Sequence, residues 1–225
     1  MSLRPIRGPA ETEPAHATDL DARDEPVVAD VDASELPDTV FGPRDLTWWG
    51  TAAFMVFEGV TLLVAAASYF YLWRNVQTWP PPGIRPPSWG LATFGVALYL
   101  LSIPAMMKLS RAARHMDLAG VRRWLVVGSA FIAAFTIVRA LEFRTLHVSW
   151  ATNAYGSLLW VILGLHGTLV AIELAEVVGM TVIMHGEDPE PKHFTDASDI
   201  AFYWYFLVGS WLPLYVLVWL LPRWA

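Results

Sequence analysis

Residues 154–184 read AYGSLLWVILGLHGTLVAIELAEVVGMTVIM, and this almost uninterrupted apolar stretch decides the fold. The hydrocarbon core of a bilayer is about 30 Å thick, so a helix that crosses it needs about 20 apolar residues. The stretch exceeds that length, which leaves room for the helix to tilt or to project from the membrane. Lipid offers the backbone no hydrogen-bond partners, so a helix is the expected structure. We therefore predict a transmembrane helix here.

Four further stretches are also long and apolar enough to span a bilayer, namely residues 47–73, 89–109, 123–143 and 197–221. The strict two-residue alternation of a transmembrane strand is absent from them. Most of the twelve tryptophans fall at or near the ends of the five stretches, where indole rings favour the head-group zone. The sequence predicts an all-α integral membrane protein, built as a bundle of five transmembrane helices.

The N-terminal segment, residues 1–46, has a different composition. It carries eleven acidic side chains, four arginines, recurrent prolines and few large apolar residues. Such a segment cannot bury enough apolar surface to offset the entropy that ordering would cost. We predict a disordered acidic tail, which leaves residues 47–225 as the membrane domain. The net charge of −6 belongs to this tail, and the chain shows no basic stripe that would indicate nucleic-acid binding.

The orientation in the membrane follows from the basic residues of the short loops. We expect Arg111, Arg114, Arg122 and Arg123 to lie in the second loop, and the first and third loops are poorer in basic residues. Basic loops stay on the cytoplasmic side. The tail and the second and fourth loops are therefore expected to be cytoplasmic, and the C-terminus external. The same four arginines either bind anionic lipid head groups or serve only to set this topology.

Charged side chains inside the spans are the candidates for chemistry. Glu58 lies near the middle of the first span, where a carboxylate is costly unless it faces protein or water. It is either a proton-accessible or lipid-contacting group, or a neutral, hydrogen-bonded acid that fixes helix packing. Arg139 and Glu142 are three residues apart on one helix face, and we interpret them as a structural ion pair.

His166, Glu173 and Glu176 fall along one stripe of the fourth span. The stripe can form a proton relay, but polar contact with a neighbouring helix is the favoured interpretation. A single histidine cannot ligate a haem between two histidines or build a copper site. The chain also has no cysteine, which removes thiolate metal sites and iron–sulfur clusters. We expect no catalytic residue, metal site, haem or copper in this chain.

A proline-rich loop follows the first span and reads Trp79-Pro80-Pro81-Pro82-Gly83-Ile84. It resembles the Trp-Pro-Pro-x-Gly-Ile loop of the cytochrome c oxidase subunit III family. Other features of the chain also resemble family motifs and occur in the family's order. Glu58 precedes the loop, and the motifs after it are Glu142-Phe143, Gly156-Ser157, Gly164-Leu165-His166-Gly167 and Tyr203-Trp204-Tyr205-Phe206. The chain departs from the family at Arg139, where a glutamine is usual, and at Leu169, Tyr205 and Val208, where the family has two histidines and an aspartate. The common form of the family has seven spans, so this chain, with five predicted spans, resembles the family's five-span form.

The resemblance implies a non-catalytic subunit of a respiratory haem–copper terminal oxidase in a bacterial-type plasma membrane. It implies that the chain packs beside the catalytic subunit I and other oxidase subunits, stabilises the catalytic subunit and holds structural phospholipids. The complex would oxidise cytochrome c, reduce oxygen to water and pump protons, with haem and copper in the partner subunits. Three alternatives stay open: a quinol oxidase subunit III, a subunit-III-like protein associated with nitric oxide reductase, and a stand-alone proton-coupled transporter.

Overall fold

The computed structural model describes residues 46–186 and 189–223, so the predicted disordered tail lies outside the described residues. The long helices are α1 (Leu46–Asn75), α2 (Trp89–Arg114), α3 (Leu118–Glu142), α4 (Ala154–Met184) and α5 (Pro191–Tyr215). Short helical segments follow two of them: the 3₁₀ helix η2 (Phe143–Thr145) follows α3, and the π-helix η3 (Val216–Leu220) and the 3₁₀ helix η4 (Leu221–Arg223) follow α5. Each of the five helices is long and apolar enough to cross a membrane. The prediction of an all-α membrane protein with five transmembrane helices is confirmed.

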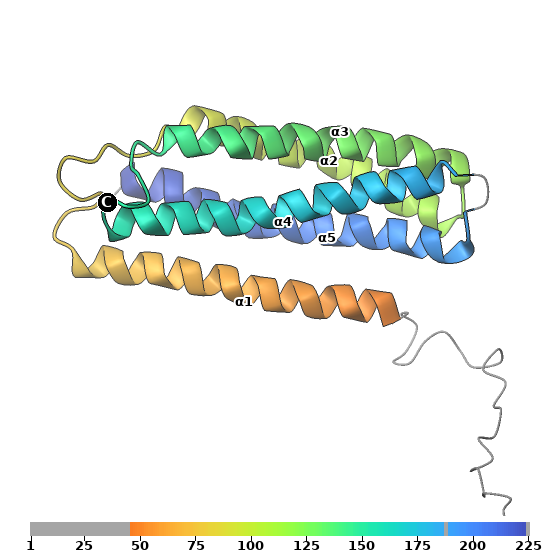
Figure 1. Cartoon of the computed structure of the whole chain (residues 1–225), viewed down its shortest axis with the longest axis horizontal. Coiled ribbons are helices and arrows are strands. Elements are labelled where there is room, and N and C mark those ends of the chain that lie inside the picture. The colour runs from red at the N-terminus through yellow and green to blue at the C-terminus, as the bar shows by residue number, and fades with distance from the viewer. Residues whose placement is uncertain (1–45, 187–188, 224–225) are drawn as a thin grey trace, which may run out of the picture. The chain divides into compact units, whose positions relative to one another are not determined.

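Four of the helices form the centre of the bundle, and α1 lies along one side of it (Figure 1). Helix α2 packs against α3 and α5, and α4 packs against the same two helices. Helix α1 packs chiefly against α4 and α5. Its apolar side chains are therefore the most exposed. Of its most apolar 18-residue segment 17% is buried, compared with 44% for the span that contains α5. The exposed face of α1 includes Phe54, Val56, Phe57, Val60, Leu63 and Val64.

The helix bounds differ from the predicted spans at the turn between α2 and α3. Helix α2 continues to Arg114 instead of ending at residue 109, and α3 begins at Leu118 instead of residue 123. Hydropathy marks the edge of the apolar core, whereas a helix ends where its backbone is capped. Here the Asp117 side chain accepts a hydrogen bond from the backbone N–H of Gly120 at 3.0 Å, and this cap starts α3.

The loop assignment of four arginines was consequently wrong. Arg111 and Arg114 lie in the last turns of α2, and Arg122 and Arg123 lie near the start of α3. The turn that connects the helices is residues 115–117. The basic residues still gather at this end of the two helices, but helical backbone positions them.

Helix α5 also begins earlier than predicted, at Pro191 instead of residue 197. Proline suits the first helical position because its missing N–H would be unpaired there anyway. The Glu190 side chain bonds the backbone of His193, and the His193 side chain accepts from the Glu190 N–H at 3.0 Å, which makes a reciprocal cap. Lys192, 2.8 Å from Glu190, holds the pKa of that exposed carboxyl below its usual value.

Candidate functional site

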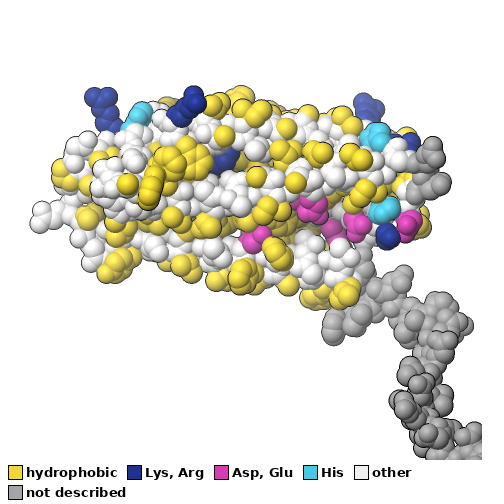
Figure 2. All heavy atoms as spheres, in the orientation of Figure 1, with side chains coloured by type: hydrophobic (Ala, Val, Ile, Leu, Met, Phe, Trp, Pro, Cys, Tyr) yellow, Lys and Arg dark blue, Asp and Glu magenta, His cyan; other side chains and the backbone are white. Residues whose placement is uncertain are grey.

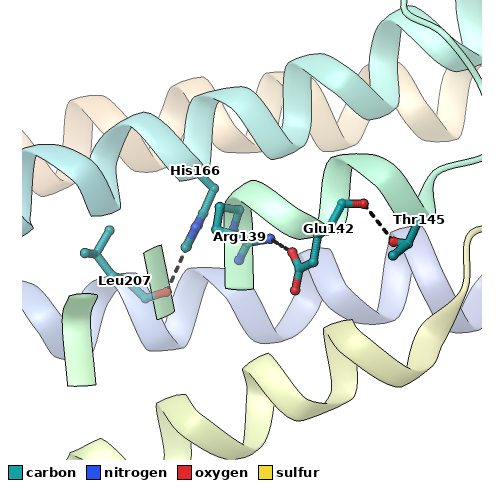
Figure 3. A network of polar contacts seen from close by, with 5 residues as sticks. All are labelled: Arg139, Glu142, Thr145, His166 and Leu207. Atoms are coloured by element: carbon teal, nitrogen blue, oxygen red, sulfur yellow. Dashed lines mark hydrogen bonds and ion pairs between the residues drawn. The ribbon is translucent and has the colours of Figure 1, made fainter. Parts of the chain in front are cut away.

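An ion pair lies buried inside the bundle, where an isolated charge would be costly. Arg139 Nη1 lies 2.5 Å from Glu142 Oε2, and the two side chains are 3% and 0% exposed (Figure 3). The two residues are one turn apart near the end of α3. The hydroxyl of Thr145 donates to the Glu142 carbonyl at 2.7 Å and so ties η2 to the last turn of α3.

Small residues on the neighbouring helices make room for this pair. A Cβ atom on Gly167 of α4 would lie 3.1 Å from Arg139 Cγ, and one on Gly95 of α2 would lie 3.1 Å from Glu142 Oε1. From the α5 side, the Trp211 ring covers the guanidinium, with Arg139 Cζ 3.3 Å from the ring centroid. The pair thus contacts all three helices that pack around α3, and cation–π attraction adds to its burial.

His166 of α4 lies next to the ion pair and forms a hydrogen bond to the neighbouring helix α5. Its Nε2 atom donates to the Leu207 carbonyl of α5 at 3.1 Å (Figure 3). This bond requires a proton on Nε2. Within the described residues, polar atoms without a hydrogen-bond partner gather here: Tyr99 Oη, Arg139 Nε and Nη2, Glu142 Oε1, His166 Nδ1 and Trp211 Nε1.

A second group of polar residues lies between α1, α4 and α5. Glu58 of α1 is buried, and its Oε2 accepts a hydrogen bond from the Tyr203 hydroxyl of α5 at 2.6 Å. Glu58, Tyr203, Asp199 of α5 and Glu176 of α4 line a pocket of about 310 Å³. In Figure 2, acidic side chains gather along this side of the bundle, above α1.

The predicted stripe of His166, Glu173 and Glu176 divides into two environments. His166 belongs to the site at the ion pair, whereas Glu176 is exposed and lines the acidic pocket. Glu173 is fully buried, and neither of its carboxylate oxygens has a hydrogen-bond partner among the described residues. No direct hydrogen bond of the described structure therefore joins the three side chains into a continuous chain.

The proline-rich loop anchors one end of the bundle. Trp79 is 9% exposed, and its Nε1–H donates to the Tyr69 hydroxyl of α1 at 2.8 Å. Its ring also meets the Tyr155 ring of α4 edge-on, with 4.8 Å between the centroids. Pro80 and Pro81 follow, and Gly83 adopts a φ of 83°, which suits glycine.

The four arginines at the opposite end have different surroundings. Arg111 and Arg114 line a pocket of about 380 Å³ together with His115 and Tyr205. Arg122 instead bonds the end of α4, donating to the Met184 carbonyl at 2.6 Å and to the Gly186 carbonyl at 2.9 Å. Cations commonly bind the free carbonyls at a helix C-terminus. The geometry thus favours Arg111 and Arg114 over Arg122 as contacts for an anionic ligand.

In the described parts of the chain, no three His, Asp or Glu side chains are grouped closely enough to hold a metal ion. The polar sites of this protein therefore consist of an ion pair, a histidine and a set of carboxylates. Such groups form hydrogen bonds and ion pairs.

Several residues of these sites were not identified from the sequence. Asp199 lies on α5 four residues before Tyr203, which was named only as part of a family motif, and a charged residue inside an apolar span is itself a signal for a polar site. Tyr99 and Trp211 surround Arg139, but an apolar span gives no sign of which aromatic side chains meet a distant charge. These contacts depend on how the helices are rotated against one another.

No family model matches the chain. It is nevertheless similar to cytochrome c oxidase subunit 3 of Synechocystis sp., with 29% identity over 187 residues, which cover 80% of this chain and 78% of the relative. Cytochrome c oxidase subunit 3 of Thermostichus vulcanus is 26% identical, with 77% of this chain and 87% of the relative covered. The probable cytochrome c oxidase subunit 3 of Mycobacterium bovis is 26% identical, with 76% of this chain and 83% of the relative covered.

Five apolar helices with buried polar groups between them define a multi-pass helical membrane protein. The relatives carry the same description in several species, and each is matched over more than three quarters of its own length. The chain thus resembles cytochrome c oxidase subunit 3 of several species, and its described part contains five helices that can span a membrane.

Proposed function

We propose that this chain is the non-catalytic subunit III of a respiratory haem–copper terminal oxidase. The observation that carries the proposal is the similarity to cytochrome c oxidase subunit 3 over about four fifths of the chain. In this proposal the chain joins a multi-subunit oxidase, and the haem and copper that reduce oxygen belong to the partner subunits. The complex transfers electrons from cytochrome c to oxygen and pumps protons, while this chain supports the catalytic subunit.

The structural role rests on a bundle that is rigid at its centre and open on one side. The His166–Leu207 hydrogen bond connects α4 and α5, and Arg139 of α3, paired with Glu142, packs against the Trp211 ring of α5. Helix α1 instead leaves large apolar side chains exposed, among them Phe57 at 74%. A rigid bundle with one such face is suited to pack beside the catalytic subunit and limit its distortion during turnover.

Lipid binding is the second part of the proposal. The pocket of Arg111 and Arg114 offers two guanidinium groups near the end of α2, and Arg groups bind phosphate well. Separately, a groove between α1 and α5 of about 440 Å³ has apolar walls that include Leu62, Phe70 and Leu217. The first site suits an anionic head group, and the second suits an acyl chain.

The proposed orientation places the N-terminus and the Arg111–Arg114 end in the cytoplasm of a bacterial-type cell. The Trp79–Gly83 loop and the C-terminus then lie on the external side. The distribution of arginines at the helix ends supports this orientation.

The test is purification of the full chain from its own membranes in a mild detergent. We expect it to elute in constant ratio with a haem-bearing chain and with oxygen-consuming activity, and to lose the haem signal when separated from that chain. Elution apart from all oxidase activity would contradict the proposal. Lipids are then extracted from the wild-type complex and from an Arg111→Gln/Arg114→Gln variant, and we expect the variant to retain less anionic lipid.

A further inference from the structure

The apolar groove between α1 and the last part of the chain has a volume of about 440 Å³. On the α1 side its lining includes Gly59, Ala66 and Phe70, and on the other side it is lined by residues of α5, η3 and η4. Helix α5 is irregular at this place, because it contains Pro213 and passes into a π-helix. Prolines and π-helical turns are common causes of bends in helices. They fall where α5 lines the groove, and so account for a space beside α1.

The groove is closed near the middle of the membrane. A Cβ atom on Gly59 would lie 3.6 Å from Phe206 Cε2, so α1 and α5 are in contact at this level. Directly before Gly59, the Glu58 carboxylate accepts a hydrogen bond from Tyr203 of α5 at 2.6 Å. From Gly59 to Phe70 the helix rises about 16 Å, and one half of the hydrocarbon core is about 15 Å thick. The groove therefore extends over one leaflet and opens toward the end of α1.

An exposed cation lies at the open end of the groove. The α1 residues Gly59, Leu63, Ala66 and Phe70 line the groove at intervals of three or four positions, so they form one stripe of the helix. Arg74 continues this stripe four positions after Phe70, in the last turn of α1. It is exposed, and neither salt bridge found among residues 46–186 and 189–223 includes it. A guanidinium group in this position can bind a phosphate through paired hydrogen bonds.

The charge at this end of the bundle favours an anionic molecule. The segments that connect or end the helices here are residues 70–90, 143–156 and 216–223, which contain four arginines and no aspartate or glutamate. The adjacent Glu142 is buried and paired with Arg139. At the left end of Figure 2, where α1 ends, basic side chains are visible and acidic ones are not. A head group with net negative charge therefore meets only positive charge, whereas the ammonium group of a zwitterion finds no exposed carboxylate in these segments.

We propose that this groove holds one acyl chain of an anionic phospholipid whose phosphate binds Arg74, an inference that rests on the lipid binding of the proposed function. The lipid belongs to the leaflet at the end of α1. The Arg111–Arg114 pocket lies at the opposite end, where α2 ends, so the chain holds one lipid in each leaflet. Trp73, beside Arg74, suits the head-group zone.

The length of the groove separates this occupant from others. A transmembrane helix, from a partner or from a second copy of the chain, crosses the whole core of about 30 Å. In the groove such a helix would meet the contact between Gly59 and Phe206 halfway. A single acyl chain reaches from the head group to the middle of the bilayer, which is the extent of the groove. A soluble phosphate would contact Arg74 but leave the apolar walls uncovered.

The first experiment tests the head-group contact. The full chain is purified in detergent and titrated with phosphatidylglycerol, and native mass spectrometry counts the bound lipid. All variants carry Arg111→Gln/Arg114→Gln, so the pocket at the other end does not contribute. We expect Arg74→Gln to weaken binding roughly tenfold, because a charge-assisted bond to phosphate is lost, and Arg74→Lys to retain part of the affinity.

Arg85→Gln is the matched control, because Arg85 is an exposed arginine at the same end that does not line the groove. We expect it to bind phosphatidylglycerol as the parent does. Equal binding by Arg74→Gln and Arg85→Gln would overturn the proposal.

The second experiment tests the acyl chain. Ala66→Phe places a ring in the groove, whereas Ala67→Phe, one residue later, places the same ring on an exposed face outside it. We expect Ala66→Phe to lose bound phosphatidylglycerol and Ala67→Phe to keep it, with far-UV circular dichroism confirming that both are folded. If Ala66→Phe does not fold, Leu63→Phe at the exposed rim of the groove replaces it.

Glycerol phosphate, which has the phosphate without the acyl chains, should not displace the lipid. Unchanged binding in the groove variant, or full displacement by glycerol phosphate, would contradict the proposal, because the apolar walls would then contribute nothing.

The third experiment locates the lipid in the complex. Phosphatidylglycerol with a photoreactive group in one acyl chain is added to the purified complex and irradiated. We expect mass spectrometry to find the label on residues 59–70 and 210–221. Label on the isolated chain but not on the chain in the complex would show that a partner covers the groove, and would overturn the proposal. Label on other faces of α1 alone would do the same. Failure of the chain to retain any haem-bearing partner would refute the proposed oxidase function instead, and lipid binding by the isolated chain would still test the groove.

Discussion

The Arg139–Glu142 pair gives the most discriminating test of how the bundle is held together. Replacing Glu142 by glutamine leaves the Arg139 guanidinium buried, at 2% exposure, without its carboxylate partner. Removing one partner of a buried ion pair costs about 3–5 kcal/mol, because the remaining charge is uncompensated. We therefore expect Glu142→Gln to lower the free energy of unfolding of the bundle by an amount in this range.

Both residues lie on α3, so the pair also forms when the helices are separated in the membrane. The pair itself then contributes little to helix association, and its effect is to allow α3 to be buried among α2, α4 and α5. It follows that the double variant Arg139→Gln/Glu142→Gln should be more stable than Glu142→Gln alone. A double-mutant cycle compares the two single variants with the double variant and gives the interaction energy between the two residues. For residues in direct contact this energy is about 0.5–3 kcal/mol, and we expect the Arg139–Glu142 interaction to lie in the upper half of that range.

The assay is unfolding of the full chain from detergent micelles by sodium dodecyl sulfate, followed by far-UV circular dichroism. Arg139→Lys should also destabilise, because an ammonium group lacks the flat face that lies against Trp211. Lys192→Gln, which breaks the exposed pair with Glu190 and leaves the Glu190 cap in place, serves as the control and should cause no measurable change. Additive effects of the two glutamine substitutions would refute the reasoning, because they would show that the two charges do not interact.

Three further predictions concern packing and capping. Trp79→Ala removes a 9% exposed indole from the proline-rich loop and should cost about 3–5 kcal/mol, detected as faster proteolysis of residues 76–88. Gly167→Ala brings a Cβ to 3.1 Å from a side-chain carbon of the buried arginine and should cost about 1–3 kcal/mol, whereas Gly164→Ala, with nothing within 4 Å, should cost nothing. Equal losses in the two alanine variants would contradict this account. Arg122→Gln removes two hydrogen bonds to the end of α4 and should speed amide hydrogen exchange there, and unchanged exchange would show that these bonds do not hold the end.

The sequence was most informative where one physical requirement dominates. Crossing a bilayer demands length and apolarity, so all five helices were predicted, and the bounds of α4 agree at both ends. The i,i+3 spacing likewise placed Arg139 and Glu142 on one face before any packing was known. Helix ends were less predictable, because Asp117 and Glu190 cap their helices outside the apolar core, where hydropathy carries no signal.

Contacts between distant helices were the least predictable part of the site. Glu58 and Tyr203 are separated by 145 residues, and their hydrogen bond depends on the rotation of both α1 and α5. Arg122 was assigned to the second loop as a possible contact for lipid head groups, yet it lies in α3 and bonds carbonyls at the end of α4. In both cases the residue type was recognised as informative, but its partner is set by tertiary packing.

Polar contacts between helices are unevenly distributed, and α1 has few of them. Lipid tails are as apolar as leucine, so helices in a bilayer associate through close packing and hydrogen bonds instead of the hydrophobic effect. The central helices have such contacts in their interior, including the Trp204 hydrogen bond to Ser102 at 2.7 Å. Helix α1 bonds α5 through Glu58 near its middle, and its Tyr69 hydroxyl accepts a hydrogen bond from Trp79 of the following loop. Because much of its surface is exposed, α1 has both the freedom and the apolar area to adapt to a neighbouring subunit. A neighbouring subunit that packs against this surface would therefore fix α1 in place, and its loss should loosen α1 before any other helix.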